Sequence, residues 1–193
     1  TLPRGVVCDG CNNYFARKVE EPFLNSEMVR EVRALEGIPN KRGLGVSVER
    51  LVFPGLPVRI TGAGSRLVSL DLTEEGAHWF RSRPNGTLRF LVGAPPAERA
   101  VSRFVAKAGV ESLADRALRA GLGTDDMVDN AGLDPVREWA RRGDPRTKWP
   151  VHVRRIYEMD RQQTAANGQC WQTLHEFTLL YTDGGELYFV LAF

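Results

Sequence analysis

The 193-residue sequence predicts an α+β protein, in which helices and strands occupy separate stretches and do not alternate regularly. Three observations support this fold class. Residues 12–37 carry apolar side chains at helical spacing, residues 45–93 carry β-branched and aromatic runs between Gly and Pro breaks, and a long helical stretch precedes three more strand-like runs. A content of 42% apolar and 26% charged residues is typical of a globular chain.

The first element expected is a short strand at residues 4–7 (RGVV), followed by a helix. The helix is expected to begin at Asn12 and to end at Pro22, because proline cannot continue a helical hydrogen-bond ladder. Phe15 and Val19, four residues apart, give this helix an apolar side.

A second helix is expected from a cap at Asn25 or Ser26 to the stop at Gly37. Its predicted apolar face consists of Met28, Val29, Val32 and Leu35. The segment 38–45 (IPNKRGLG) is rich in turn residues, and it is the predicted boundary between a partial finger at 1–37 and a domain at 46–193.

The domain at 46–193 is predicted to contain a mainly antiparallel sheet. Its first expected strands are GVSVERLVF, PVRI, RLVSLDL and TLRFLVG, with a hairpin turn at Asn85-Gly86. The last expected strands are WPVHVRRIY, WQTLHEFTLLY and ELYFVLAF, with a hairpin loop at residues 182–185.

Two helices are predicted inside this domain. Pro95-Pro96 introduces a helix at 97–120, and Pro135 and Gly143 delimit a shorter one. The expected buried side of the longer helix consists of Val101, Phe104, Val105, Ala108, Leu113 and Ala117.

Cys8 and Cys11, two residues apart, are the main chemical signal. Two thiolates at this spacing supply half of a tetrahedral zinc site, or alternatively a redox-active pair. The redox alternative is disfavoured because no βαβ pattern surrounds the pair. With Cys170 as the third thiol, the sparse and odd cysteine set favours a reducing, cytoplasmic compartment. No apolar run approaches the roughly 18 residues of a membrane span.

The stretch VCDGCNNYFARKVEEP (7–22) resembles the last element of the ββα-metal finger of HNH-type endonucleases, in the variant with Asn in place of the last His. The resemblance implies that Cys8 and Cys11 are two of four structural zinc ligands. It also implies that Asn12, or less well Asn13, binds a catalytic Mg²⁺ or Mn²⁺, and that Lys18 lies near a phosphate. A hard carbonyl oxygen suits these metals. The alternative role of the asparagines is helix capping.

Members of this family also need an upstream CxxC and a segment with a general-base His, which this sequence does not contain before Cys8. The chain is therefore expected to be catalytically incomplete and to bind zinc poorly through two thiols alone. Weaker likeness to the downstream region of some bacterial HNH proteins covers KAGVE, LDPVREWARRGDPRTKWPVHVRRIY and LHEFTLLYT and assigns no site.

Residues 137–155 are rich in basic side chains and contain Trp139 and Trp149. The candidate nucleic-acid contacts in this stretch are Arg141, Arg142, Arg146 and Lys148. The alternative is a solvated helix face whose tryptophans belong to the core. Two functions stay open: an HNH-type endonuclease acting on nucleic acid, with DNA as the expected partner, and a non-catalytic nucleic-acid-binding or protein-interaction module.

Overall fold

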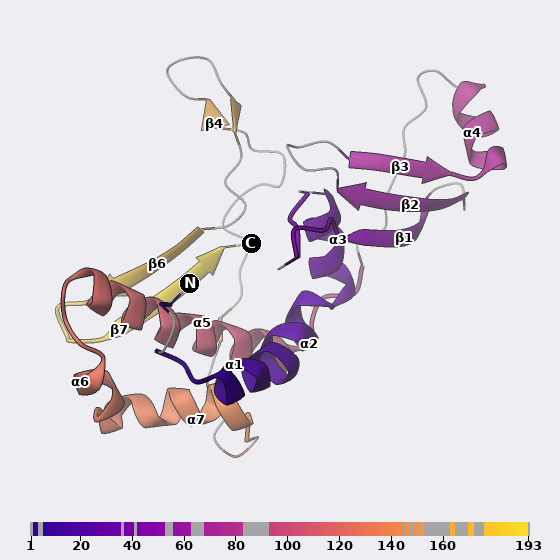
Figure 1. Ribbon diagram of the computed structural model, residues 1–193. Helices are drawn as coiled ribbons and strands as arrows, with labels where there is room; N and C mark the ends of the chain where they lie inside the picture. The colour runs from indigo at the N-terminus through magenta and orange to yellow at the C-terminus, as the bar shows by residue number, and fades with distance from the viewer. Residues whose placement is uncertain are drawn as a thin grey trace. The chain divides into compact units, whose positions relative to one another are not determined.

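The computed structural model describes most of the chain. The described residues are 2–3, 6–35, 37–40, 42–52, 56–62, 68–82, 93–144, 146, 149, 151–152, 163–164, 170–171 and 176–192. They combine helices with antiparallel strand pairs (Figure 1), which confirms the predicted α+β class. The expected hairpin turn at Asn85-Gly86, the strand at 87–92 and most of the strand at 149–157 lie outside the described residues.

The described helices and strands follow one another in this order: α1 (Asp9–Phe15), η1 (Ala16–Glu20), α2 (Glu21–Leu24), α3 (Glu27–Leu35), β1 (Ser47–Val52), β2 (Leu56–Gly62), β3 (Val68–Leu72), α4 (Glu74–Arg81), α5 (Glu98–Arg119), α6 (Asp125–Val128), η2 (Ala131–Leu133), α7 (Asp134–Arg142), β4 (Gln163–Thr164), β5 (Cys170–Trp171), β6 (Glu176–Tyr181) and β7 (Leu187–Ala192).

Contacts group these elements into two compact units. Unit 1 consists of Thr1–Val19 and Glu98–Phe193, and unit 2 consists of Glu20–Ala97. These units are groupings by contact, and the predicted domain boundary at residues 38–45 lies inside unit 2. The division into a partial finger and a downstream domain stays a prediction.

Unit 2 contains the antiparallel sheet β1-β2-β3, whose strands the sequence predicts from β-branched and aromatic runs between Gly and Pro breaks. Val48 lies opposite Ile60 in the register, and both side chains are buried with Val58 and with Ala34 of α3. The helix therefore packs its apolar side on the sheet. The residues buried within α3 are Val29, Glu31 and Ala34.

Helix α4 in unit 2 was not predicted, although the sequence contains its start signal. Thr73 caps the helix by accepting a hydrogen bond from the N–H of Gly76 at 3.2 Å, and Glu74 and Glu75 follow in the first turn. Thr followed by two acidic residues is a helix N-terminus pattern. Trp79 of this helix packs against the core of the sheet.

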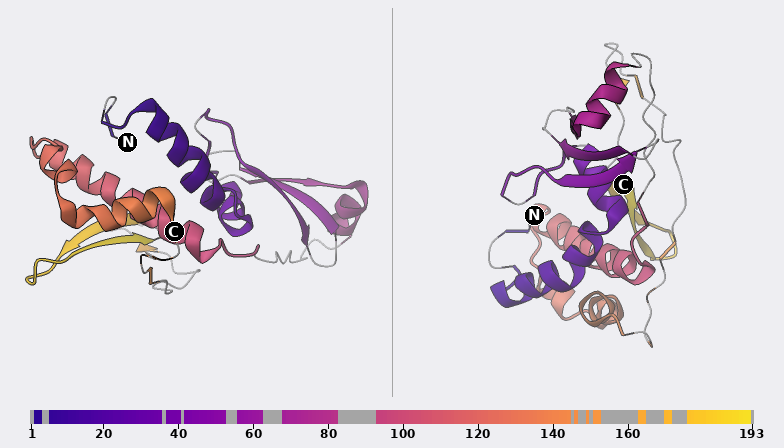
Figure 2. Two further views of the ribbon diagram at one scale, coloured as in Figure 1. Left: turned by 90° about the horizontal axis from the view of Figure 1, so that it is seen from below. Right: turned by 90° about the vertical axis from the view of Figure 1, so that its right-hand side faces the viewer.

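Unit 1 is built around α5, whose predicted span is confirmed. It contacts α7 and both strands of the β6–β7 hairpin, and it lies between them in Figure 1 and in the right-hand view of Figure 2. The predicted hairpin loop at residues 182–185 is confirmed by the bond from the N–H of Gly185 to the carbonyl of Thr182 at 3.0 Å. Helix α7 ends as predicted at Gly143, which adopts φ 60°.

The predicted buried side of α5 is only partly correct. Its buried residues are Val101, Ser102, Ala106 and Ala114. Because α7 covers one side of α5 and the β6–β7 hairpin covers another, close packing favours small buried residues such as Ser102, Ala106 and Ala114. A Cβ added at Gly109 would lie 3.1 Å from the Cβ of Phe189 in β7.

The predicted start and end of the first helix are wrong. Residues 6 and 7 form a bend and not a strand, and α1 already begins at Asp9. The helical path continues through the π-helix η1 into α2, so Pro22 does not end it. Pro22 occupies the first turn of α2, where the missing N–H of proline is tolerated.

Candidate nucleic-acid interface

The two cysteines lie at the very start of α1. Cys8 is the N-cap residue, and its Sγ accepts a hydrogen bond from the N–H of Cys11 at 3.2 Å. The pair is therefore part of the first turn of the helix. Cys8 is exposed and Cys11 is half-buried, and both are free thiols.

The thiol environment distinguishes the two cysteines. Hydrogen bonds from the side chain and the backbone of Cys11 lower the pKa of Cys8. The hydrogen bond with Cys8 and the charge of its thiolate raise the pKa of Cys11, while the guanidinium of Arg141 opposes this effect. Arg141, at the end of α7, is therefore close enough to Cys11 to act on it electrostatically.

Asn12 and Asn13 lie inside α1 with exposed side chains. The N–H of Asn12 donates to the carbonyl of Cys8 at 2.9 Å, so this residue is already helical and is not the cap. The capping alternative for the asparagines is thus wrong, because Cys8 occupies the cap position. Lys18, in η1, is exposed as well.

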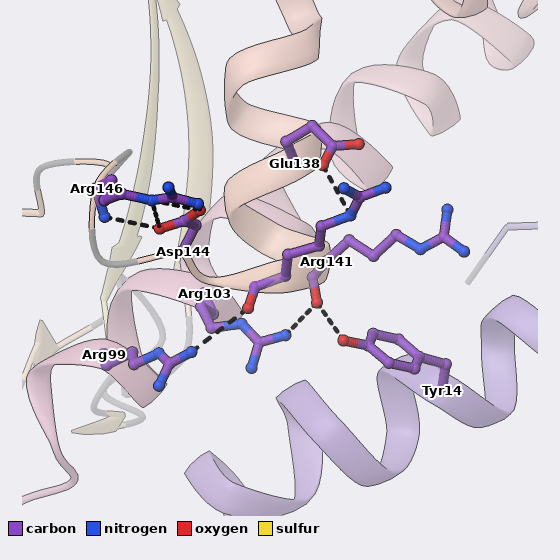
Figure 3. A network of polar contacts seen from close by, with 8 residues as sticks. Tyr14, Arg99, Arg103, Glu138, Arg141, Asp144 and Arg146 are labelled. Carbon is purple, nitrogen blue, oxygen red and sulfur yellow. Dashed lines mark hydrogen bonds and ion pairs between the residues drawn. The ribbon is translucent and has the colours of Figure 1, made fainter.

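Of the four basic residues predicted to contact nucleic acid, two form ion pairs, one is exposed and one lies outside the described residues. Arg142 pairs with Glu138 at 3.0 Å, and Arg146 pairs with Asp144 at 2.8 Å. Hydrogen bonds from the side chain and the backbone N–H of Arg146 hold the pKa of Asp144 at about 2. Arg141 is exposed, and Figure 3 shows its guanidinium extending away from Asp144. Lys148 lies outside the described residues.

Arg137 and Trp139, in the same basic stretch, have structural roles. Arg137 donates to the carbonyls of Met127, Val128 and Asn130 and to the carboxylate of Asp134, and so fixes the turn before α7. Trp139 is 2% exposed, and its Nε1 donates to Ser102 Oγ at 2.8 Å. Base stacking is therefore excluded for Trp139, whereas Trp149 is 38% exposed.

A set of hydrogen bonds joins α1 and η1 to the end of α7 within unit 1 (Figure 3). The hydroxyl of Tyr14 donates to the carbonyl of Arg141, across 127 positions of sequence. Arg103 of α5 donates to the carbonyls of Ala140 and Arg141 and to that of Lys18. Sequence reasoning missed Tyr14 and Arg103, since no local pattern marks bonds between such distant residues.

The donor set fits half of a zinc site. Cys8 and Cys11 offer two adjacent sulfur donors, and a closed structural site needs four ligands. In the described part of the chain, no cluster of three or more His, Cys, Asp or Glu side chains is placed to hold a metal. Asn12 offers one exposed amide oxygen, of the type that Mg²⁺ or Mn²⁺ binds.

Comparisons with known protein families, with curated proteins and with solved structures find no match to this chain. None of the helices in the described residues combines the length and the apolar character that a bilayer-spanning helix needs.

Proposed function

We propose that this chain is the nucleic-acid-binding part of an HNH-type, metal-dependent endonuclease. One observation supports this proposal above the others: the exposed helix that begins with Cys8 lies beside Arg141, although the two are far apart in sequence. Cys11 and Lys18, from the stretch that carries the HNH resemblance, thus lie near Arg141, from the basic stretch, within unit 1.

The side chains on this surface have the chemistry that a phosphodiester backbone requires. Arg141 and Lys18 offer exposed cations for phosphate oxygens, and Arg142 joins them once its exposed pair with Glu138 exchanges for a phosphate. Asn12 offers a neutral oxygen ligand, and a bound Mg²⁺ or Mn²⁺ would stabilise the charge that develops on the phosphate. Cys8 and Cys11 would anchor the start of α1 through a structural zinc ion.

A non-catalytic binding module is the second candidate. It is favoured by the exposed cations of Arg141 and Lys18, which can bind phosphate oxygens without a metal ion. This module would use the same cations and would bind nucleic acid without cleaving it.

Nucleic-acid binding is tested by fluorescence anisotropy with a duplex DNA, a single-stranded DNA and an RNA over a series of salt concentrations. We expect Arg141→Ala with Arg142→Ala to weaken binding and to flatten the plot of log Kobs against log salt by about one unit per lost phosphate contact. The matched control is Arg42→Ala with Arg119→Ala, which removes the same charge from exposed positions elsewhere. Equal losses in the two double variants would contradict a specific surface.

Cleavage separates the two candidates. The chain as it stands and the product of its full reading frame are incubated with labelled DNA and RNA in Mg²⁺ or Mn²⁺. We expect cleavage by a product that includes a general-base His, and we expect Asn12→Ala to abolish it while Asn13→Ala retains it. Inactivity of every form with both metals would favour the binding module, and full activity of Asn12→Ala would refute the assignment of Asn12.

A further inference from the structure

The C-terminal end of α7 is closed by arginines from α5. The last carbonyls of a helix have no partner within the helix and carry partial negative charge. Arg103 donates from Nε to the carbonyl of Ala140 at 3.2 Å and from Nη2 to that of Arg141, and Arg99 donates to the carbonyl of Arg142 at 3.4 Å. Two cations thus neutralise this helix end.

The same guanidinium of Arg103 also bonds a second segment. Its Nη1 donates to the carbonyl of Lys18 in η1 at 3.0 Å. A guanidinium is planar and its donors have fixed directions, so three carbonyls are held in one arrangement. Two of those carbonyls belong to Arg141 and Lys18, the candidate phosphate contacts.

Gly143 leaves the space that this arrangement needs. A Cβ at position 143 would lie 2.6 Å from Cδ and 2.8 Å from Nε of Arg103. Tyr14 adds a further bond from α1 to the carbonyl of Arg141. The stem of Arg103 therefore passes directly over the glycine that ends α7, and the half-buried side chain is constrained on several sides.

We infer that Arg103 is the positioning residue of the proposed nucleic-acid surface: it holds the backbones of Arg141 and Lys18 at a fixed separation, so that both side chains meet one phosphate backbone. This inference rests on the proposed function. Arg103 acts through these two residues, because three of its five donors are already bonded to carbonyls.

Substitution of Arg103 by Gln and by Lys tests the inference, with Arg119→Gln on the same helix as the charge-matched control. A positioning role requires the donor fork, so Arg103→Lys should lose DNA affinity as Arg103→Gln does, on the order of tenfold. A role as a positive charge near DNA would instead let Arg103→Lys retain wild-type affinity, and this result would overturn the inference. Circular dichroism confirms that each variant is folded.

A double-mutant cycle gives the second readout. If Arg103 acts through Arg141, the loss of affinity in Arg103→Gln with Arg141→Ala should be smaller than the product of the two single losses. Fully additive effects would mean that Arg103 contacts DNA independently, which also overturns the inference.

Hydrogen exchange without DNA keeps this test separate from the proposed function. We expect faster exchange at the amides of residues 16–20 and 140–143 in Arg103→Gln and Arg103→Lys than in Arg119→Gln. If the wild-type chain binds no nucleic acid but the Arg103 variants show this faster exchange, the proposed function fails. Arg103 would then still be shown to hold the backbones of Lys18 and Arg141 in place. Unchanged exchange in both Arg103 variants would refute the positioning role directly.

Discussion

Gly143 is required for two separate reasons, its backbone conformation and the space that it leaves for a neighbouring side chain. It ends α7 with φ 60°, a left-handed conformation that side chains other than glycine adopt at a cost, and it also gives Arg103 room to pass. Gly121, at φ 75°, also has a left-handed conformation, but nothing lies within 4 Å of a Cβ added there.

We expect Gly143→Ala to lower the free energy of unfolding by more than Gly121→Ala does. Each variant meets the left-handed strain of about 1–2 kcal/mol. Gly143→Ala must in addition displace the guanidinium of Arg103 from the carbonyls of α7. Urea unfolding measures both values, and equal losses would show that Arg103 moves aside freely.

Asp144 gives a prediction of pH dependence at the residue scale. Its pKa of about 2 in the folded chain is below the ordinary value of about 3.9, because Arg146 donates to the carboxylate. A pKa that falls on folding adds stability above pH ~4, and this contribution is lost as the pH falls through about 2.

The carboxyl carbon chemical shift of Asp144, followed by NMR, should therefore titrate with a midpoint at about 2. In Arg146→Gln the midpoint should return toward the ordinary value, since the donated side-chain hydrogen bonds are removed. A midpoint that is the same in both chains would show that Arg146 does not hold the carboxylate in solution.

The packing of α5 on α7 depends on a polar contact within an apolar interface. Ser102 Oγ accepts from Trp139 Nε1 and donates to the carbonyl of Trp149, each at 2.8 Å. Ser102 is 1% exposed and Trp139 is 2% exposed, so the indole N–H of Trp139 relies on Ser102 in the absence of water.

We expect Ser102→Ala to destabilise the fold by about 1–3 kcal/mol, because it leaves the buried indole N–H of Trp139 without an acceptor. Trp139→Phe should lower the free energy of unfolding less in the Ser102→Ala background than in the wild-type chain. The loss of ring packing is the same in both backgrounds, but in Ser102→Ala the substitution also removes the unpaired indole donor. Ser82→Ala, at an exposed helix end, is the control with a change of about 0.5 kcal/mol or less. Additive losses would refute the coupling.

Elements with local signals were the predictable part of the fold. Gly143 and the two prolines before α5 mark helix ends through their own backbone restrictions, and β-branched runs between Gly and Pro breaks mark β1 to β3. Pro22 misled the prediction because the π-helix η1 places it in a first turn. The start of α1 was misplaced because a cysteine, and not Asn12, caps it.

The candidate site was predictable as two separate stretches and not as one surface. Cys8, Asn12 and Arg141 each stand out by residue type and spacing. Their proximity depends on bonds from Tyr14 and Arg103 to backbone carbonyls, and a carbonyl carries no sequence signal. The pairing of Arg142 and Arg146 with acidic neighbours was visible at short spacing, and it reduces the number of free cations on this surface.

At the scale of the whole molecule, unit 1 uses both ends of the chain, while unit 2 is continuous in sequence. Pairing of distant segments costs loop-closure entropy, and contiguous strands pair sooner. In pulse-labelled refolding, we expect protection of amides in β1 to β3 before protection in α1. Protection of α1 at the same time as or before the sheet would contradict this order.

The divided make-up of unit 1 also matters during synthesis. The cysteine pair leaves the ribosome before Arg141, which acts on the Cys11 thiol and lies 130 positions after Cys11. At typical elongation rates of about 5–20 residues per second, roughly ten seconds separate the two. A nascent chain therefore exposes its two thiols to cellular metal ions and oxidants before Arg141 has been synthesised. Metal binding or oxidation of the pair can thus occur before unit 1 has folded around it.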